Sequence, residues 1–258
     1  MLNWSIKAAG GSIPTTMNFA LKHWGRLKRS WGRRYREWRL PSGYERLGTK
    51  YGGWWLDSSL IGDQPLLVDC GLGEDISFPD AFLDRFGGRV IGVEANPRSL
   101  DYCRRHCPEG MEIRPQAMWK TAGETLTFYL PRPQDQLPKG ADGVSGSLMD
   151  SHEYVEGGQQ VNVTTTSLLE LLSDTGRAQC DMLKLDIEGA EYEVLEELCQ
   201  SAAIRKTQQL LVEYHHEVTH HSLRETSASV DLIQEAGFNL VHIESRNYIF
   251  SRIDSTTD

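Results

Sequence analysis

The sequence predicts an α/β fold in which a doubly wound sheet of about seven strands ends in an antiparallel last strand. Three observations lead to this prediction. A buried apolar segment, Leu66–Cys70, runs into a glycine loop and then into a helix. Strand-like and helix-like patterns then alternate along the chain, as is typical of parallel sheets. Finally, two strand-like segments close the chain with only a tight turn between them, and parallel strands need longer connections.

Length and composition indicate one main domain with an extension. Of the 258 residues 39% are apolar, which is enough for a substantial core. We expect residues 1–50 to form a basic, aromatic-striped helical extension and residues 51–258 to form the main domain. Residues 1–50 hold 11 Lys and Arg and two Glu, a net charge of +9, whereas the remainder carries −18. The overall charge of −9 therefore conceals a basic segment beside an acidic domain.

The sequence shows no sign of membrane insertion or secretion. It has no apolar run long enough for a membrane span, and its start lacks the pattern of a secretory signal. The five cysteines form no CxxC pair, which favours a reducing compartment. We therefore expect a cytoplasmic protein.

Residues 16–40 have the pattern of an amphipathic helix that ends before Pro41. Large apolar side chains recur at spacings of three and four, and arginines occupy much of the remaining surface. Three interpretations stay open: the helix docks on the protein's own acidic domain, it makes a peripheral contact with an anionic membrane, or it binds RNA or a protein partner. The following Tyr51–Trp55 segment either caps a ligand site or fills the bottom of the sheet.

The glycine loop after the first strand is the leading candidate for a ligand site. Asp69 ends the strand, and Gly71 and Gly73 let a ligand approach the backbone closely. The loop lacks the third glycine of a dinucleotide-binding motif, because Ile76 stands there, and the two acids after Gly73 would repel a pyrophosphate. A positively charged ligand without phosphate fits better, and S-adenosylmethionine is such a ligand. A simple turn is the alternative interpretation.

The second predicted strand, Arg89–Ala95, has an acid, Glu94, near its C-terminal end. This acid stands 25 residues after Asp69, where acids accept hydrogen bonds from ribose hydroxyls in doubly wound folds. A helix cap or a surface acid is the alternative. Pro97 begins a helix that reaches His106. A third strand, Met111–Ala117, then brings residues 116–118 to the place where an adenine edge would lie.

An extra strand, Thr125–Leu130, precedes a long polar segment. Residues 131–158 are rich in Pro, Gly and Ser, and loops of this length inside a compact domain are usually functional or disordered. We expect this loop to shape the substrate side of the site, with residues 143–148 nearest to it. A short strand and a helix follow, with Thr166 or Ser167 as the N-cap.

The strand Met182–Ile187 places Lys184 and Asp186 on one face. A lysine inside an apolar strand is rarely left unpaired, so we expect Lys184 to meet Asp186 or Asp69. A purely structural ion pair is one interpretation, and a functional acid at the end of a central strand is the other. Gly189 begins the next helix, and Glu191 in its first turn suits the helix dipole.

The strand Gln209–His216 brings Glu213 and His215 to its C-terminal end. These two side chains suit either proton transfer or metal coordination. A helix over residues 223–236 follows, and a hairpin that turns at Ser245 and Arg246 completes the chain.

Several segments together resemble the FkbM family of S-adenosylmethionine-dependent methyltransferases. They read VDCGLGEDISF, VIGVEANP, MLKLDIEGAEYEVL and LLVEYHH, and the KLDIEGAE run is the most specific of them. The resemblance covers about residues 66–250 and implies the Rossmann-like class I methyltransferase fold with S-adenosyl-L-methionine as cofactor. The chain departs from the family pattern at Cys70 and Leu72, in the acidity of the loop, and at Ala95, where the family often has Pro.

The resemblance also implies roles for site residues. Asp69, Gly71 and Gly73 would line the methionine part of the cofactor, Glu94 would bind the ribose, and Asp186 would lie between cofactor and acceptor. The full set expected to bind the cofactor is Asp69, Gly71, Leu72, Gly73, Glu94, Ala95, Asn96, Gln116, Ala117 and Asp186. The set expected to act in catalysis is Lys184, Asp186, Glu188, Glu213 and His215.

The implied reaction is O-methylation of a sugar or another small-molecule hydroxyl. Because the methyl group of the sulfonium is already activated, the enzyme mainly positions the two reactants. The hydroxyl proton would pass to Asp186, Glu188 or His215. A divalent metal on Asp186, Glu213 and His215 is an alternative route, although we assign no metal ligand from the sequence.

Two rival functions stay open. One is a methyltransferase-fold protein with little catalysis that binds a partner or RNA through the basic extension. The other is an RNA methyltransferase that uses this extension as a phosphate-binding arm. The chain lacks an NPPY-like base-flipping motif, which disfavours nucleic acid as the substrate. Neither the acceptor nor the oligomeric state follows from the sequence.

Overall fold

The computed structural model describes residues 40–137, 139 and 143–253. The predicted helix over residues 16–40 lies outside the described residues, apart from Leu40. A compact unit begins at Pro41. Its first two strands, β1 (Tyr44–Leu47) and β2 (Trp54–Asp57), pair antiparallel, and this hairpin spans the boundary that the sequence predicted at residue 50.

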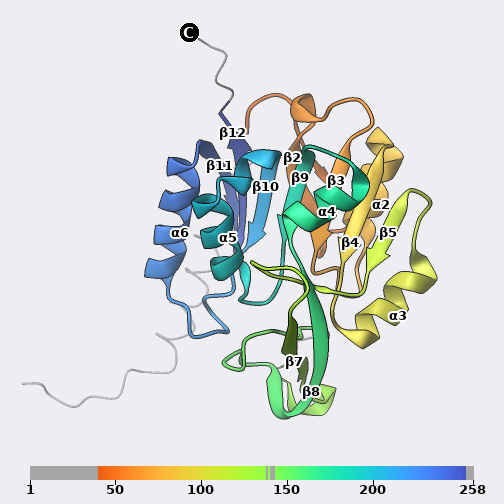
Figure 1. Cartoon of the computed structure of the whole chain (residues 1–258), viewed down its shortest axis with the longest axis vertical. Helices are drawn as coiled ribbons and strands as arrows, with labels where there is room; N and C mark the ends of the chain where they lie inside the picture. Colours follow the sequence, from red (N-terminus) through yellow and green to blue (C-terminus); the bar gives the residue numbers. More distant parts are fainter. Residues whose placement is uncertain (1–39, 138, 140–142, 254–258) are drawn as a thin grey trace, which may run out of the picture. The chain divides into compact units, whose positions relative to one another are not determined.

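The central sheet confirms the predicted fold class. Its seven strands have the order β11-β12-β10-β9-β3-β4-β5, and only β12 runs antiparallel to its neighbours (Figure 1). The order reverses between β3 and β9, which makes the edge at their C-terminal ends the usual ligand position in such sheets. The bounds are β3 (Leu66–Cys70), β4 (Arg89–Val93), β5 (Met111–Arg114), β9 (Cys180–Leu185), β10 (Thr207–Glu213), β11 (Phe238–Glu244) and β12 (Asn247–Arg252).

Helices cover both faces of this sheet because alternate strand residues point to opposite sides. Val68 and Leu183 pack in a core with α4, α5 and α6, whereas Leu67 and Met182 pack in a core with α2 and β2. Within the described residues, every helix is too short or too polar to cross a bilayer. The helices are α2 (Ser77–Phe86), α3 (Pro97–His106), α4 (Leu168–Thr175), α5 (Glu191–Gln200), α6 (Leu223–Glu235) and the short 3-10 segments η1 (Ser58–Leu60), η2 (Gln134–Gln136) and η3 (Ala203–Lys206).

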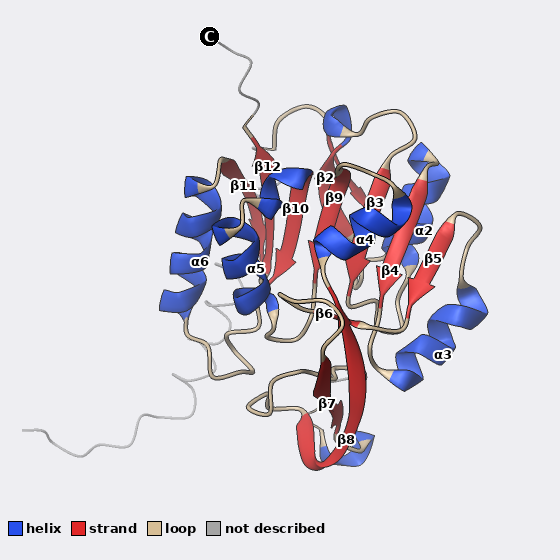
Figure 2. Cartoon of the chain, in the orientation of Figure 1, coloured by secondary structure: helices blue, strands red, loops and turns tan. Residues whose placement is uncertain are grey.

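A second, smaller sheet lies beside the C-terminal ends of the central strands (Figure 2). It has the order β6-β8-β7, with β6 (Ala117–Met118), β7 (Thr125–Pro131) and β8 (Val155–Thr166). The predicted loop over residues 131–158 is therefore wrong at its C-terminal end, because Val155 already pairs with Pro131. The sequence of this segment could not show the early start of β8, because the hydrogen bonds that form the strand come from β7.

The predicted strand Met111–Ala117 is also wrong in one respect, because it is divided in two. β5 ends at Arg114, and Gln116 N donates to Arg114 O at 2.9 Å to close a turn around Pro115. Proline has no N–H to continue the ladder of strand hydrogen bonds. Ala117 and Met118 then join the small sheet instead of the central one.

Candidate active site

The candidate site lies where β3, β4, β9 and β10 end. The glycine loop follows β3, and a hydrogen bond of 3.0 Å from Asp186 N to Cys70 O joins the end of β9 to the start of this loop. Gly71 has a φ of +81°, and a Cβ at this position would collide with the carbonyl oxygen of Asp186. Only glycine therefore lets the loop pack against Asp186. By contrast, a Cβ at Gly73 would meet no protein atom within 4 Å.

Glu94 holds the glycine loop in place. Its Oε2 accepts hydrogen bonds from Leu72 N at 3.0 Å and from Gly73 N at 2.9 Å, and its Oε1 accepts one from Asn96 N at 2.7 Å. Burial raises the pKa of Glu94, although these backbone donors oppose the shift. The acid thus lies beside the loop, and its predicted contact with a ribose stays a prediction.

The other predicted cofactor residues divide into two groups. Asn96 caps α3 by accepting from Arg98 N at 3.0 Å, and its side-chain amide donates to Val144 O at 3.0 Å, which ties this corner to the loop over residues 143–154. Gln116 instead donates to Thr165 O at 3.3 Å, and the buried Ala117 pairs with the same strand, β8. Ala95, between Glu94 and Asn96, is half-buried.

Lys184 meets an acid, as the sequence predicted. Its Nζ lies 2.9 Å from Asp69 Oδ1 and 3.6 Å from Asp186 Oδ2, and it donates to Gly71 O at 3.0 Å. Burial lowers the pKa of Lys184, but the two carboxylates outweigh burial and raise it. Lys184 therefore stays charged and links the glycine loop to β9. Its predicted action on an acceptor stays a prediction.

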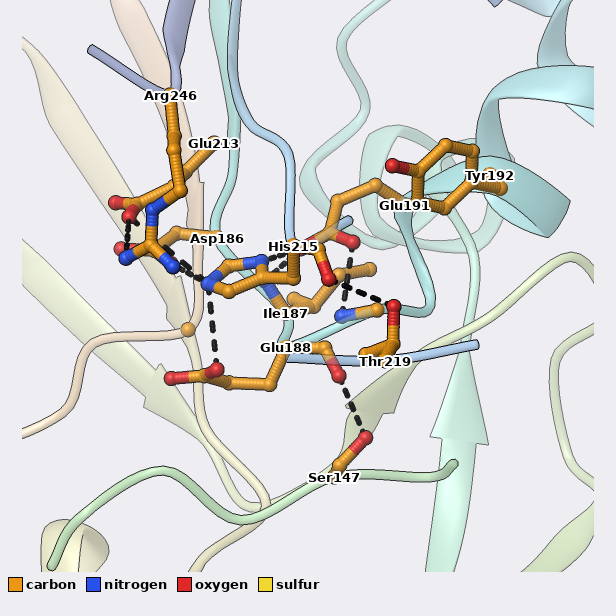
Figure 3. A network of polar contacts seen from close by, with 12 residues as sticks. Ser147, Asp186, Ile187, Glu188, Glu191, Tyr192, Glu213, His215, Thr219 and Arg246 are labelled. Atoms are coloured by element: carbon orange, nitrogen blue, oxygen red, sulfur yellow. Dashed lines mark hydrogen bonds and ion pairs between the residues drawn. The ribbon is translucent and has the colours of Figure 1, made fainter. Parts of the chain in front are cut away.

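A buried histidine lies at the centre of the acidic residues (Figure 3). His215 Nδ1 lies 2.7 Å from Glu191 Oε1. The other ring nitrogen, Nε2, lies 3.2 Å from Glu188 Oε2, 3.6 Å from Asp186 Oδ1 and 4.0 Å from Glu213 Oε1. The structure therefore brings together four of the five residues that the sequence assigned to catalysis, and the fifth, Lys184, contacts one of them.

The charges in this centre depend on one another. Burial raises the pKa of Asp186 to about 8, and Glu213 adds to this effect. Burial lowers the pKa of His215, but Glu188 and Glu191 outweigh burial and raise it to about 10. Burial alone would raise the pKa of Glu188, whereas His215 and the hydrogen bond from His152 lower it to about 2. The centre therefore keeps positive charge at the imidazole.

Glu191 has a larger part in the site than the sequence indicated. It is fully buried, and it accepts hydrogen bonds of 2.9 Å from Ile187 N and from Gly189 N besides its contact with His215. These bonds hold the turn in which Glu188 has a φ of +54°. The sequence did contain a signal: Glu191 stands three and four residues before the buried Val194 and Leu195, on the apolar face of α5.

Residues of the 143–154 loop complete the site, and sequence reasoning did not assign them to it individually. Ser147 Oγ donates to Glu188 O at 2.6 Å. His152 Nδ1 accepts from Tyr154 N, so its Nε2 carries the proton that is donated to Glu188 Oε2 at 2.9 Å. The expectation that residues 143–148 lie near the site is confirmed for Ser147.

The residues that can share a metal ion differ from the predicted set. Asp186, Glu188 and His215 each offer one ligand atom, and these atoms lie within 4.8 Å of one another. The sequence had placed Glu213 in this set. In the structure, Glu213 Oε1 instead forms a 2.5 Å ion pair with Arg246 from the turn between β11 and β12. Arg246 was not predicted as a site residue, because nothing in a hairpin turn shows which strand end it faces.

The chain was also compared with known protein families and structures. The family model described as the methyltransferase FkbM domain matches residues 69–240. A search among curated proteins found no match. Among solved structures, the chain is similar to a precorrin-6y C5,15-methyltransferase from Geobacter metallireducens (11% identity, 76% of this chain and 82% of that one, TM-score 0.40). It is also similar to a putative S-adenosylmethionine-dependent methyltransferase from Listeria monocytogenes (9%, 76% and 95%, TM-score 0.41) and to the METTL16 methyltransferase domain (9%, 75% and 63%, TM-score 0.41).

Proposed function

The chain belongs to the FkbM methyltransferase family, and we propose that it transfers the methyl group of S-adenosyl-L-methionine to a hydroxyl oxygen of a sugar or another small molecule. The observation that carries this proposal is the junction of the glycine loop with the acidic centre. Gly71 packs directly on the backbone of Asp186, so a cofactor on the loop lies next to the carboxylates around His215.

The cofactor side of the site suits S-adenosylmethionine. Its ammonium and sulfonium groups are positive, and acids surround the loop, with Asp69 at its start and Glu94 beneath its amides. The open position at Gly73 gives a ligand direct access to the backbone. Glu94 lies beneath the amides of the loop at the end of β4, which supports the expected bond to a ribose hydroxyl.

The acceptor side suits a neutral hydroxyl. In the proposed reaction the acceptor oxygen forms a bond to the methyl carbon while the carbon–sulfur bond breaks, and S-adenosylhomocysteine leaves. The hydroxyl proton passes to a carboxylate next to His215. Asp186 is placed for this step because its side chain is the most exposed of those around His215, at 27%, and its raised pKa makes its ionised form, which is present mainly above about pH 8, the stronger base. Proximity of the two reactants supplies several kcal/mol, up to about 7–11 in favourable cases.

A labelled methyl group tests this proposal. We expect the wild-type protein to bind S-adenosylmethionine in calorimetry and to move its labelled methyl group to oxygen in a panel of sugars and other hydroxyl compounds. Asp186→Asn should lower kcat by about 10²–10⁴-fold. The matched control is Asp231→Asn, an exposed acid on α6.

Two outcomes would contradict the proposal. Transfer of the label only to nitrogen would reject a hydroxyl acceptor, and transfer only to RNA would reject a small-molecule acceptor. A folded wild-type protein that binds no cofactor would reject methyl transfer as stated.

A further inference from the structure

Three ligand atoms in the acidic centre have the spacing of a metal site. His215 Nε2 lies 3.2 Å from Glu188 Oε2 and 3.6 Å from Asp186 Oδ1. Atoms that bind one small divalent ion at about 2.0–2.2 Å in tetrahedral or octahedral geometry lie roughly 2.8–3.6 Å from one another. All three ligand atoms lie within 4.8 Å of one another, so the two carboxylates need only a small closing movement to share an ion.

Buried partners fix two of these three ligands in orientation. The fully buried carboxylate of Glu191 faces His215 Nδ1, so Nδ1 carries a proton and Nε2 is directed at the carboxylates. The fully buried ring of His152 donates to Glu188. Metal-binding histidines commonly give their other nitrogen to a carboxylate, and metal-binding carboxylates are themselves hydrogen-bonded. Both features are present here on side chains that come from different segments of the chain.

The neighbouring cations form their shortest ion pairs with acids outside this set of three. Lys184 Nζ lies 2.9 Å from Asp69 Oδ1 and 3.6 Å from Asp186 Oδ2, whereas the other oxygen of Asp186, Oδ1, faces His215. Arg246 is paired with Glu213. A lone pair on Nε2 that faced two carboxylate oxygens would be repelled, so either a proton or a metal ion must supply positive charge at this atom.

We propose that Asp186, Glu188 and His215 bind a divalent transition-metal ion. An imidazole nitrogen in the set favours such an ion over Mg²⁺ or Ca²⁺, which prefer oxygen ligands. The side chains of Asp186 and Glu188 are 27% and 20% exposed, so positions on the ion remain open to a water molecule or to the acceptor oxygen. A hydroxyl bound to the ion would lose its proton more readily. This assignment deepens the proposed function, yet metal binding itself can be measured without it.

The test uses the full chain after treatment with a chelator. Mn²⁺ is titrated and followed by the loss of the free-ion signal in electron paramagnetic resonance, and cofactor binding is measured on the same samples. We expect one Mn²⁺ per chain, which Zn²⁺ displaces and equimolar Mg²⁺ does not. Asp186→Asn and Glu188→Gln should each weaken binding at least about tenfold. The control Glu217→Gln, an exposed acid close in sequence, should leave it unchanged.

The result would overturn the proposal if the folded protein bound no Mn²⁺, or if both ligand variants bound it as the wild type does. Thermal unfolding of each variant shows whether it is folded. His152→Phe offers a second check, because loss of the partner of Glu188 should weaken Mn²⁺ binding about 10–100-fold while leaving all three ligands in place. Absent metal binding with intact cofactor binding would reject the metal site alone and leave methyl transfer standing.

Discussion

Gly73 offers the sharpest test of where the cofactor lies. Gly73→Ala adds one methyl group at a φ of +57°, in a space where no protein atom lies within 4 Å. Gly176→Ala is its matched control, because Gly176 has a φ of +66° in the left-handed region, is equally open, and lies at the C-terminal end of α4. Both variants force alanine into the left-handed region, which costs about 1–2 kcal/mol.

The two variants should therefore unfold alike and bind differently. We expect both melting temperatures to fall by about 2–8 °C, since 1 kcal/mol shifts the Tm of a domain of this size by roughly 2–4 °C. Only Gly73→Ala places its methyl group where the cofactor approaches the loop. Overpacking of one methyl group costs about 1–3 kcal/mol, so its affinity for S-adenosylmethionine should fall about 5- to 150-fold.

Calorimetry with S-adenosylmethionine, and scanning calorimetry of the free proteins, supply both readings. Equal cofactor affinity of Gly73→Ala and the wild type would refute the reasoning, because the cofactor could not then contact this part of the loop. An equal loss of affinity in Gly176→Ala would show that the loss comes from the altered stability and not from contact at the loop.

Three further predictions follow from individual contacts. Lys184→Met leaves Asp69 buried without its cation and should lower the free energy of unfolding by about 3–5 kcal/mol in urea titrations. Adding Asp69→Asn should restore part of this loss. A double variant that is less stable than Lys184→Met would argue against the pairing. Glu191→Gln replaces one acceptor oxygen of Glu191 by an NH₂ group, which then faces another donor. This variant should lower the free energy of unfolding by about 1–3 kcal/mol in the same titrations, whereas Glu196→Gln on the exposed face of α5 should leave it almost unchanged. In native protein at pH 8, a thiol reagent should label Cys107 first, because it is the exposed cysteine. Burial raises the pKa of Cys199 to about 11, so little of the reactive thiolate of Cys199 is present at pH 8. A fast phase that persists in Cys107→Ser would contradict this assignment.

Much of the central sheet could be predicted because its signals are local. The strand Leu66–Cys70 and the helix Pro97–His106 have the predicted bounds, since an apolar run, a glycine loop and an N1 proline mark their ends within a few residues. The small sheet was predicted poorly. The start of β8 and the division of the strand at Pro115 depend on pairing between segments that are distant in sequence.

The candidate site was likewise predicted only in part. A charged lysine within an apolar strand needed an acid, and this alone predicted the pairing of Lys184. The amino-acid pattern also placed Asp186, Glu213 and His215 at strand ends that meet at one edge. It did not show that Glu213 pairs with Arg246, or that Ser147 and His152 reach Glu188.

The sequence by itself thus determined the alternation of elements, the glycine loop, and the need of Lys184 for a counter-charge, because burial and periodicity are properties of single segments. Only the tertiary structure decided which acids surround His215. His215 lies 24 residues from Glu191 along the chain but only 2 from Glu213, and Arg246 lies 33 residues from Glu213. Which of them meet depends on how strands β9, β10 and the β11–β12 turn are arranged in space, and no local pattern contains that information.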